Sequence, residues 1–590
     1  MDPISAATGI IGLFSTCRDC YLFFSKLNNA DNDMRFMIDD LDIEAAFLKS
    51  WGCYWGIHPP GLSSSPKLED YLKKNPYKQY GVAKILLRIG ELMTDDEELL
   101  TRYGVKLMLR DGQRMDKRPK INDFRIPFKD ELQILKNFKD NKNAMRKRMG
   151  LLNRCRWTIL GGRDDFFKLL ETLRQYNKNL YRFCPEGAGV DLNRFCHISF
   201  LDSHHEPLPL RMVSEQTDRL VQREEDPSIK EGLELLRDMM RLKGKAGFYN
   251  TKPVTESERH ALLKYRPEML SFRREEESST IAELNESSKS VSMVYVEFKS
   301  YRDDTGAKDQ DHQDDILKLG RLMLYDEASY RLNTMGCLGL FKDSRRGRIG
   351  FIFRLPSPLE KPLAHWDAYE PYRLLDFLKD GTHPFELGRR FDLAKTLVDN
   401  VIRLHTVGWL HKNIRSESIL FFPQSLKKGE RGYYGPYFMG YDFIRIEIDR
   451  TPDDIHDEDS NRRHPSRLVE IARGEDHCPD IYHHPDKRNS PGRVYQYAYD
   501  IYSLGLLLIE IGLWQPLHRI VRGREHSEPH SLREYIIGKV DNELAAACGL
   551  IYTKVVRTFL TMTSKSSLDA MKRQRDTCAK MASELSRCVV

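Results

Sequence analysis

The stretch AYDIYSLGLLLIEIGLWQPL, residues 498–517, decides the fold of the C-terminal half of the chain. Its long apolar pattern predicts a helix, and a second helical pattern covers residues 385–409. Upstream, VSMVYVEFKSY (291–301) alternates like a strand, and residues 332–356 contain two apolar runs that predict a hairpin. The sequence therefore predicts a β-rich segment that starts near residue 290 and is followed by an α-rich segment.

Four shorter motifs stand in a fixed order around these elements: VEFK (296–299), HKNIRSESIL (411–420), YDF (441–443) and HHPD (483–486). Together with residues 498–517, where Asp500 leads the helix, they resemble the protein-kinase fold over about 290–585. The resemblance implies an α+β, bilobal, kinase-like domain over 290–586.

The resemblance also implies roles for three residues that would hold a nucleotide. Lys299 takes the place of the lysine that binds phosphate, and Asp442 takes the place of the metal-binding aspartate. The acidic partner of Lys299 is expected near Asp315, with Asp314 beside it. These residues leave ATP binding open. The other interpretation is structural, because a lysine paired with a buried carboxylate can hold a lobe together without ATP.

The catalytic loop, however, is degenerate. His411 is retained, but Asn413 replaces the base aspartate, and an amide cannot accept the proton of a substrate hydroxyl as a carboxylate does. Ser418 replaces the second metal ligand, and Arg415 preserves only the charge of a lysine. No glycine occurs between Gly247 and Gly306, so the loop that would cover the phosphates is missing. We therefore expect a pseudokinase that needs no cofactor and binds no metal.

The N-terminal part of the chain has a different character. Helical patterns cover residues 3–27, 34–57, 81–104, 128–159 and 164–185. Little of this region alternates like a strand, so the sequence predicts an all-α bundle over 1–225. Residues 186–230 are expected to be rich in loops, and residues 226–289 to supply a connecting helix and then a polar, Ser-rich linker.

Three blocks of this region are TGIIGLFSTCRDCYLFF (8–24), LDIEAAFLKSWG (41–52) and RCRWTILGGRDDFFKLLETLRQYNKNLYRFCP (154–185). In order and spacing they resemble the HeLo domain of fungal prion-inhibition and propagation proteins, which act in heterokaryon incompatibility. That domain is related to the four-helix bundle of the mixed-lineage kinase domain-like necroptosis executor. The resemblance implies a bundle that is directed against membranes and whose first helix can leave the bundle and enter the bilayer.

The residues that would enter the bilayer are Ile10, Ile11, Leu13 and Phe14. The glycines beside them each lower helix stability by about 1 kcal/mol relative to alanine. Marginal stability suits a segment that must be released. The alternative is that these four residues are only core residues, and the wide apolar coverage predicts that the helix is mostly buried at rest.

The charge of the chain is uneven. The whole chain carries +6, but residues 102–156 hold 17 Lys/Arg against 6 Asp/Glu, an excess of +11 that leaves −5 for the rest. Such a region can attract an anionic leaflet. The alternative is a solvated helix face with a basic loop. A nucleic-acid partner is not expected, because interleaved aromatic residues and a recognisable module are missing.

Length and composition also bear on the number of domains, on metal binding and on the site of synthesis. At 590 residues the chain is too long for one core, and its 40% apolar residues suffice for packed domains. The eleven cysteines are irregularly spaced, and the pair Cys17 and Cys20 has no companion pair, so we expect buried thiols rather than a metal site. The N-terminus lacks a convincing secretion signal and no run of 18 uncharged apolar residues occurs, so we expect synthesis in the cytosol.

These observations lead to one main interpretation and two alternatives. The main one is a cell-death or allorecognition effector that is cytoplasmic at rest. An upstream protein activates its pseudokinase half, and the bundle then self-associates and permeabilises the plasma membrane through anionic lipids. The alternatives are an atypical Ser/Thr protein kinase that binds ATP and a non-catalytic signalling scaffold.

Overall fold

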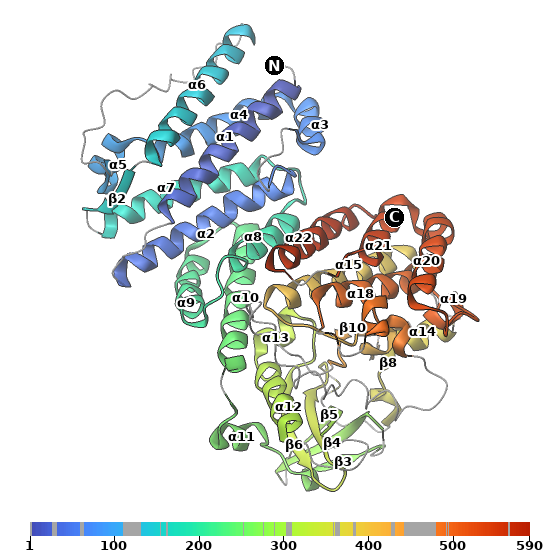
Figure 1. The fold of residues 1–590 in the computed structure, drawn as a ribbon. Coiled ribbons are helices and arrows are strands. Elements are labelled where there is room, and N and C mark those ends of the chain that lie inside the picture. The colour runs from blue at the N-terminus through green and yellow to red at the C-terminus, as the bar shows by residue number, and fades with distance from the viewer. Residues whose placement is uncertain are drawn as a thin grey trace. The chain divides into compact units, whose positions relative to one another are not determined.

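The computed structural model describes residues 3–589 apart from 26–31, 59–63, 110–130, 154, 161–162, 252, 275–276, 288–289, 302–309, 358, 360–365, 381–384, 426–430, 442–478, 491–492, 494 and 565–566. The chain divides into two compact units. The first comprises residues 1–204 and 208–240, and the second comprises residues 205–207 and 241–590. Figure 1 shows helices alone through most of the first unit, whereas the second contains both strands and helices.

The first unit is built from helices. They are α1 (Pro3–Phe24), α2 (Asn32–Tyr54), α3 (Pro66–Lys74), α4 (Pro76–Leu92), α5 (Asp96–Tyr103), α6 (Glu131–Leu152), α7 (Arg163–Arg182), α8 (Gly189–Leu201), α9 (Pro207–Arg223) and the first part of α10 (Pro227–Thr251). Helix α1 contacts α2, α3, α4 and α6, so it lies inside the bundle. Helix α2 also packs against α7 and α8.

Local sequence explains where two of these helices begin and end. The Ser65 hydroxyl accepts a hydrogen bond from the Leu68 N–H at the start of α3, which satisfies a donor that the helix cannot pair. Asp95 does the same for Glu98 at the start of α5. Helix α5 ends at Gly104, whose φ of 64° lies in the left-handed region that glycine adopts without strain.

Two predictions for the first unit are wrong, one on its all-α character and one on its loops. Strand β1 (Val105–Leu109) pairs antiparallel with β2 (Cys155–Ile159), although residues 155–159 were predicted to continue a helix. Residues 189–223, expected to be rich in loops, form α8 and α9. In the first case two strands of five residues are too short for a clear alternation.

The second unit begins with a five-stranded antiparallel sheet in the order β3-β4-β5-β7-β6. Its strands are β3 (Leu270–Phe272), β4 (Ser279–Ser287), β5 (Ser290–Ser300), β6 (Cys337–Asp343) and β7 (Arg348–Arg354), accompanied by α11 (Glu256–Leu262), α12 (Gln310–Met323) and α13 (Asp326–Arg331). Helix α12 packs against β6 and β7. The predicted strand at 291–301 and the predicted hairpin at 332–356 are confirmed.

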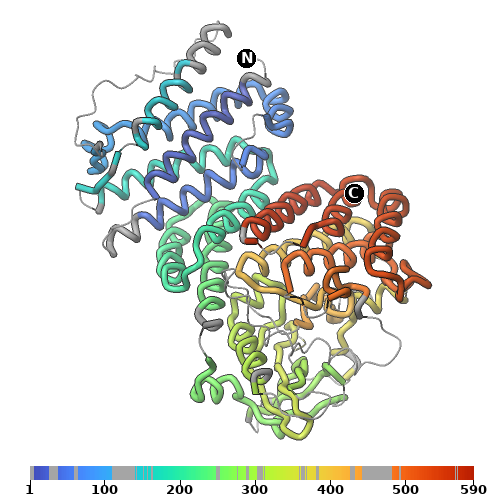
Figure 2. The backbone as a smooth tube through the Cα atoms, in the orientation of Figure 1, coloured from blue at the N-terminus to red at the C-terminus, as the bar shows by residue number. Residues whose placement is uncertain are grey.

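The rest of the second unit is mainly helical around a small sheet of order β10-β9-β8. Its strands are β8 (Tyr372–Arg373), β9 (Ile419–Ser425) and β10 (Arg431–Phe438), and its helices are α14 (Leu374–Asp380), α15 (Leu387–Thr406), α17 (Pro485–Asn489), α18 (Tyr497–Leu513), α19 (Leu517–Ile520), α20 (Pro529–Lys539), α21 (Ala545–Leu560) and α22 (Leu568–Leu585). The backbone trace in Figure 2 follows these helices through the red end of the chain. Helix α18 packs against α15, α21 and α22, which confirms the helix predicted at 498–517.

The predicted polar linker is also a strand in part. Residues 279–287 form β4, which pairs with β3 on one side and β5 on the other. The division between the two units falls within α10, after Met240, and not at the ends of a linker. Composition misled here because the polar residues Ser279, Glu283 and Asn285 alternate along the strand with buried residues.

Candidate functional site

The loop at 411–418 lies between α15 and β9. Asp500 holds it in place. This carboxylate, fully buried in the first turn of α18, accepts the backbone N–H groups of His411 at 2.7 Å and Lys412 at 2.9 Å. Buried backbone donors must be paired, so a single side chain determines the path of the loop.

Two further groups complete the surroundings of Asp500. The His405 ring reaches it through Nε2 at 3.2 Å, and the Tyr495 hydroxyl donates to it at 3.1 Å. Burial alone would raise the pKa of Asp500, but the hydrogen bonds from His405 and from the His411 backbone lower it below its usual range. The carboxylate is therefore ionised and satisfied by hydrogen bonds in the protein interior.

His411 itself is a neutral core residue. It is fully buried, and its ring lies 4.2 Å from Phe438 and 4.3 Å from Tyr441. Burial lowers the pKa of His411 to about 3, so the ring carries no charge near neutral pH. Its position serves packing rather than proton transfer.

Asn413 and Ser418 use their polar atoms within the protein. The Asn413 amide donates to the Gly440 carbonyl at 2.7 Å. The Ser418 hydroxyl donates to the Arg415 carbonyl at 2.7 Å and accepts the Arg415 N–H at 3.2 Å. Gly440 has a φ of 74°, and an added Cβ would lie 3.2 Å from Ser418 and 3.3 Å from Asn413, so glycine suits this close approach.

Lys299 is already paired inside its own unit. Its ammonium lies 2.6 Å from a carboxylate oxygen of Glu297 and donates to the Tyr441 carbonyl at 2.5 Å. The predicted partner, Asp315, is wrong, because it pairs with Lys318 at 3.1 Å on α12. The alternative acid, Asp314, pairs with Arg259. Asp442, the other predicted nucleotide residue, lies outside the described residues.

Glu297 is the residue that the sequence reasoning missed. It precedes Lys299 by two positions on β5, so both side chains leave the same face of the strand. Its second oxygen accepts the Gly440 N–H at 3.2 Å, which connects β5 to the segment that follows β10. A nucleotide phosphate would have to compete with this carboxylate for Lys299. The period of two residues was the signal that could have identified the pair.

Glu510 is a second buried acid that contacts the loop at 411–418. One oxygen of Glu510, on α18, accepts from the Tyr482 hydroxyl at 2.8 Å, the Ser416 hydroxyl at 3.2 Å and the Leu517 N–H at 2.7 Å. Burial, and next the charge of Glu417, raise the pKa of Glu510 to about 8. Glu510 is therefore protonated at neutral pH, in contrast to Asp500.

Helix α1 of the first unit carries the four predicted membrane residues. Ile10, Leu13 and Phe14 are at most 1% exposed and Ile11 is 6% exposed, which confirms that the helix is buried. The Phe14 ring lies 5.9 Å from that of Trp51 on α2. The four residues are therefore part of the core of the first unit.

Comparison with known families finds a match within this unit. Residues 4–212 match the HeLo family model, which is described as prion-inhibition and propagation. The match runs from α1 through α8 and ends within the first two turns of α9, and it suggests a role in fungal cell death or heterokaryon incompatibility. No curated protein matches the chain.

Glycines allow close packing around α1 in the HeLo region. A Cβ on Gly52 of α2 would lie 2.2 Å from the Phe14 ring, and a Cβ on Gly12 would lie 2.3 Å from the side-chain end of Lys142 on α6. Burial lowers the pKa of Lys142. One neighbour is a rigid ring and the other a flexible chain, so these two contacts respond differently to substitution.

The remaining predictions for the HeLo region concern its cysteines and its charge. Cys17 and Cys20 are buried thiols, as predicted: Cys17 donates to the Leu86 carbonyl at 3.0 Å and Cys20 lies 3.4 Å from the Met149 sulfur. Much of the basic stretch, residues 110–130, lies outside the described residues. Among the helices of the described part, none combines the length and apolarity needed to cross a bilayer.

Proposed function

We propose that the chain is a cell-death or allorecognition effector whose HeLo region acts on membranes and whose second unit controls it. The observation that carries the proposal is the HeLo match together with the burial of α1. The side chains of Ile10, Ile11, Leu13 and Phe14 are buried and carry no polar atom, so lipid chains can replace their surroundings without leaving a polar group unpaired. On activation, α1 leaves the bundle, copies of the chain associate, and the apolar residues enter an anionic leaflet.

The second unit is the kinase-like regulator in this proposal. Support comes from its strand order, in which the lysine strand β5 is central, and from the loop at 411–418 anchored by the leading aspartate of α18. Its chemistry is lost: Asn413 has no carboxylate, and Glu297 occupies the ammonium of Lys299. The regulator therefore responds to an upstream protein without transferring phosphate.

The test is leakage of vesicles that contain phosphatidylserine. The full chain is compared with a chain that ends at Met240, the last residue of the first unit. We expect the shorter chain to release the vesicle contents, because it lacks the regulator, and the full chain to remain inactive until it is activated. If neither protein binds the vesicles or makes them leak in any state, the proposal is wrong.

Two charge insertions separate membrane contact from bundle stability. Leu13→Glu on α1 and Leu169→Glu on α7 both place a carboxylate at a buried position. Both loosen the bundle, but only the first charges the surface that enters the lipid. We expect Leu13→Glu to abolish leakage and Leu169→Glu to retain or increase it. Equal loss in both variants would show that leakage reports only an intact fold.

A further inference from the structure

In the first unit, the end of α2 and the start of α3 place a lysine ammonium against two aromatic rings. The Nζ atom of Lys67 lies 3.6 Å from the centre of the Tyr54 ring and 5.9 Å from the centre of the Trp55 ring. A cation within about 6 Å of a ring centre is attracted by the negative face of the ring. The ammonium of Lys67 therefore lies at a point where both rings favour positive charge.

The two rings form a corner. Their centroids are 4.9 Å apart and their planes meet at 82°, so they present two walls to one cation. The Tyr71 ring packs near Trp55, with 4.8 Å between the centroids, and extends the aromatic surface. Aromatic cages that recognise quaternary ammonium groups work in the same way, because one cation is attracted to several ring faces at once.

The corner is held in place by hydrogen bonds and by burial. The Ser65 hydroxyl donates to the Trp55 carbonyl and accepts the Leu68 N–H at the start of α3, so it joins this helix to the ring. Tyr54 is 8% exposed and Trp55 is 2% exposed. A set of rings fixed in this way loses little conformational freedom when a ligand binds.

Lys67 differs from the rings because its side chain is exposed to solvent. Its ammonium is strongly hydrated, so water can compensate it when it leaves the corner. A trimethylammonium group carries the same charge, but its methyl groups are apolar and donate no hydrogen bond to water. Such a group gains more from the aromatic faces than the ammonium does, so it can replace Lys67.

We propose that the corner of Tyr54 and Trp55 binds a trimethylammonium group, as in choline and its esters, while Lys67 moves aside. The positive charge faces both rings, and the methyl groups fill the space between them. This inference goes beyond the proposed function, which requires anionic lipid and no choline. Binding is measured without any membrane, so its failure leaves that function untouched.

The test follows the methyl proton resonance of choline by NMR as the full chain is added. We expect an upfield shift, because protons above the face of an aromatic ring are shielded by its ring current. The comparison probe is dimethylbutanol, the analogue of choline in which carbon replaces the charged nitrogen. It should bind at least about threefold more weakly, because it carries no charge to attract the rings.

Replacing Lys67 tests whether it is the internal cation. Lys67→Gln removes the competing charge, so we expect choline to bind about two- to fivefold more tightly. Lys84→Gln, at an exposed position on α4, is the matched control and should bind as the wild type does. A merely structural role for Lys67 would leave the affinity for choline unchanged.

Replacing Tyr54 tests the wall of the corner. Tyr54→Leu should weaken binding at least about threefold, whereas Tyr54→Phe keeps the ring and should retain binding. Tyr77→Leu is the matched control, because Tyr77 on α4 is 69% exposed and lies outside the corner. If Tyr54→Leu does not fold, the gain expected for Lys67→Gln decides.

Two sources of the ligand can be distinguished. Vesicles of phosphatidylcholine that displace choline would identify a lipid headgroup, and no displacement would identify a soluble quaternary amine. The proposal is overturned if choline does not bind, if the neutral analogue binds equally well, or if Lys67→Gln leaves the affinity unchanged.

Discussion

Helix α1 and the loop at 411–418 are both buried, but they are held in opposite ways. The four candidate residues of α1, Ile10, Ile11, Leu13 and Phe14, are buried and carry no polar side-chain atom. The loop is held by directed hydrogen bonds, with the backbone N–H groups of His411 and Lys412 on Asp500 and the Asn413 amide on Gly440. Apolar contacts are non-directional, so under our proposal these four residues exchange protein for lipid, whereas the loop would leave unpaired donors if it moved.

This comparison suggests a division of roles between the units. Helix α1, which we propose leaves the bundle, presents apolar side chains that are compatible with lipid. The segment that resembles a catalytic loop has instead become a fixed part of the interior, because its polar atoms are consumed by the fold. Breaking each mode of attachment should therefore have effects of different size.

Removing the anchor of the loop should have the largest effect. Asp500→Ala leaves two buried backbone N–H groups without an acceptor, each at a cost of about 1–3 kcal/mol. We expect the free energy of unfolding of the second unit to fall by about 4 kcal/mol, measured by denaturant titration. Asp392→Ala on α15, whose side chain is 76% exposed, is the control and should change little. An effect below that of the control would show that the loop is not held by Asp500.

Truncating the core of α1 should come next. Leu13→Ala removes a fully buried side chain, and such changes cost about 2–5 kcal/mol. Because the bundle holds α1 less firmly, vesicle leakage should also require less activation. Leu22→Ala on the same helix is the control, since Leu22 is 38% exposed. If Leu13→Ala stabilised α1 against hydrogen exchange, the apolar attachment of this helix would be refuted.

The two glycine contacts of α1 should differ. In Gly52→Ala the new methyl group meets the rigid Phe14 ring, and overpacking of this kind costs about 1–3 kcal/mol. In Gly12→Ala it meets the end of Lys142, which can move, and the gain in helix propensity of about 1 kcal/mol offsets the disturbance. Thermal unfolding of both variants measures the difference, and equal destabilisation would contradict the role given to the ring.

The smallest effect concerns pH. Glu510 has a folded pKa of about 8 against its ordinary 4.5, so the folded state retains a proton that the unfolded state loses. Its contribution is complete below pH 4.5 and is lost as pH rises toward 8, so stability should fall by about 1 kcal/mol between pH 6.5 and 7.5. His411 acts in the opposite direction, but only below its unfolded pKa of 6.5. Glu510→Gln should remove the slope, whereas Glu534→Gln, at an exposed site, should keep it.

Sequence reasoning succeeded where a pattern was long and periodic. Helices α1 and α18 and the hairpin of β6 and β7 were predicted because their apolar residues repeat over many positions. Strand β4 was missed because its composition is polar, and β1 and β2 because they are short. In these cases pairing partners far along the chain determine the structure, and local composition does not contain them.

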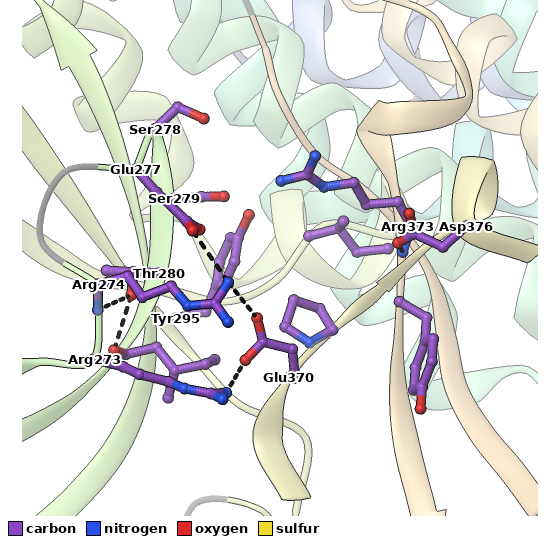
Figure 3. A pocket seen from close by; sticks show the side chains of 14 residues that line it. Arg273, Arg274, Glu277, Ser278, Ser279, Thr280, Tyr295, Glu370, Arg373 and Asp376 are labelled. Atoms are coloured by element: carbon purple, nitrogen blue, oxygen red, sulfur yellow. Dashed lines mark hydrogen bonds and ion pairs between the residues drawn. The ribbon is translucent and has the colours of Figure 1, made fainter. Parts of the chain in front are cut away.

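The candidate site was predictable only in part. Lys299 was identified by its motif, but its partner was sought on a helix by analogy, whereas the structure supplies Glu297 from the same strand. The cavity that Arg273 and Arg373 line (Figure 3) could not be predicted, because these residues are one hundred positions apart and only the fold places them around one space. For the partner of Lys299, the alternation of side chains along β5 is therefore a better guide than the analogy with the kinase fold.

The most direct test of the account is photo-crosslinking to lipid. A photoreactive side chain is placed at Ile11 on α1 or, as the matched control, at Leu169 on α7, both of which are buried. The chain that ends at Met240 is then irradiated on phosphatidylserine vesicles while they leak. The account predicts that lipid is labelled from position 11 and not from position 169. Leakage with equal labelling from both positions, or with no labelling from position 11, would contradict the release of α1 into the membrane.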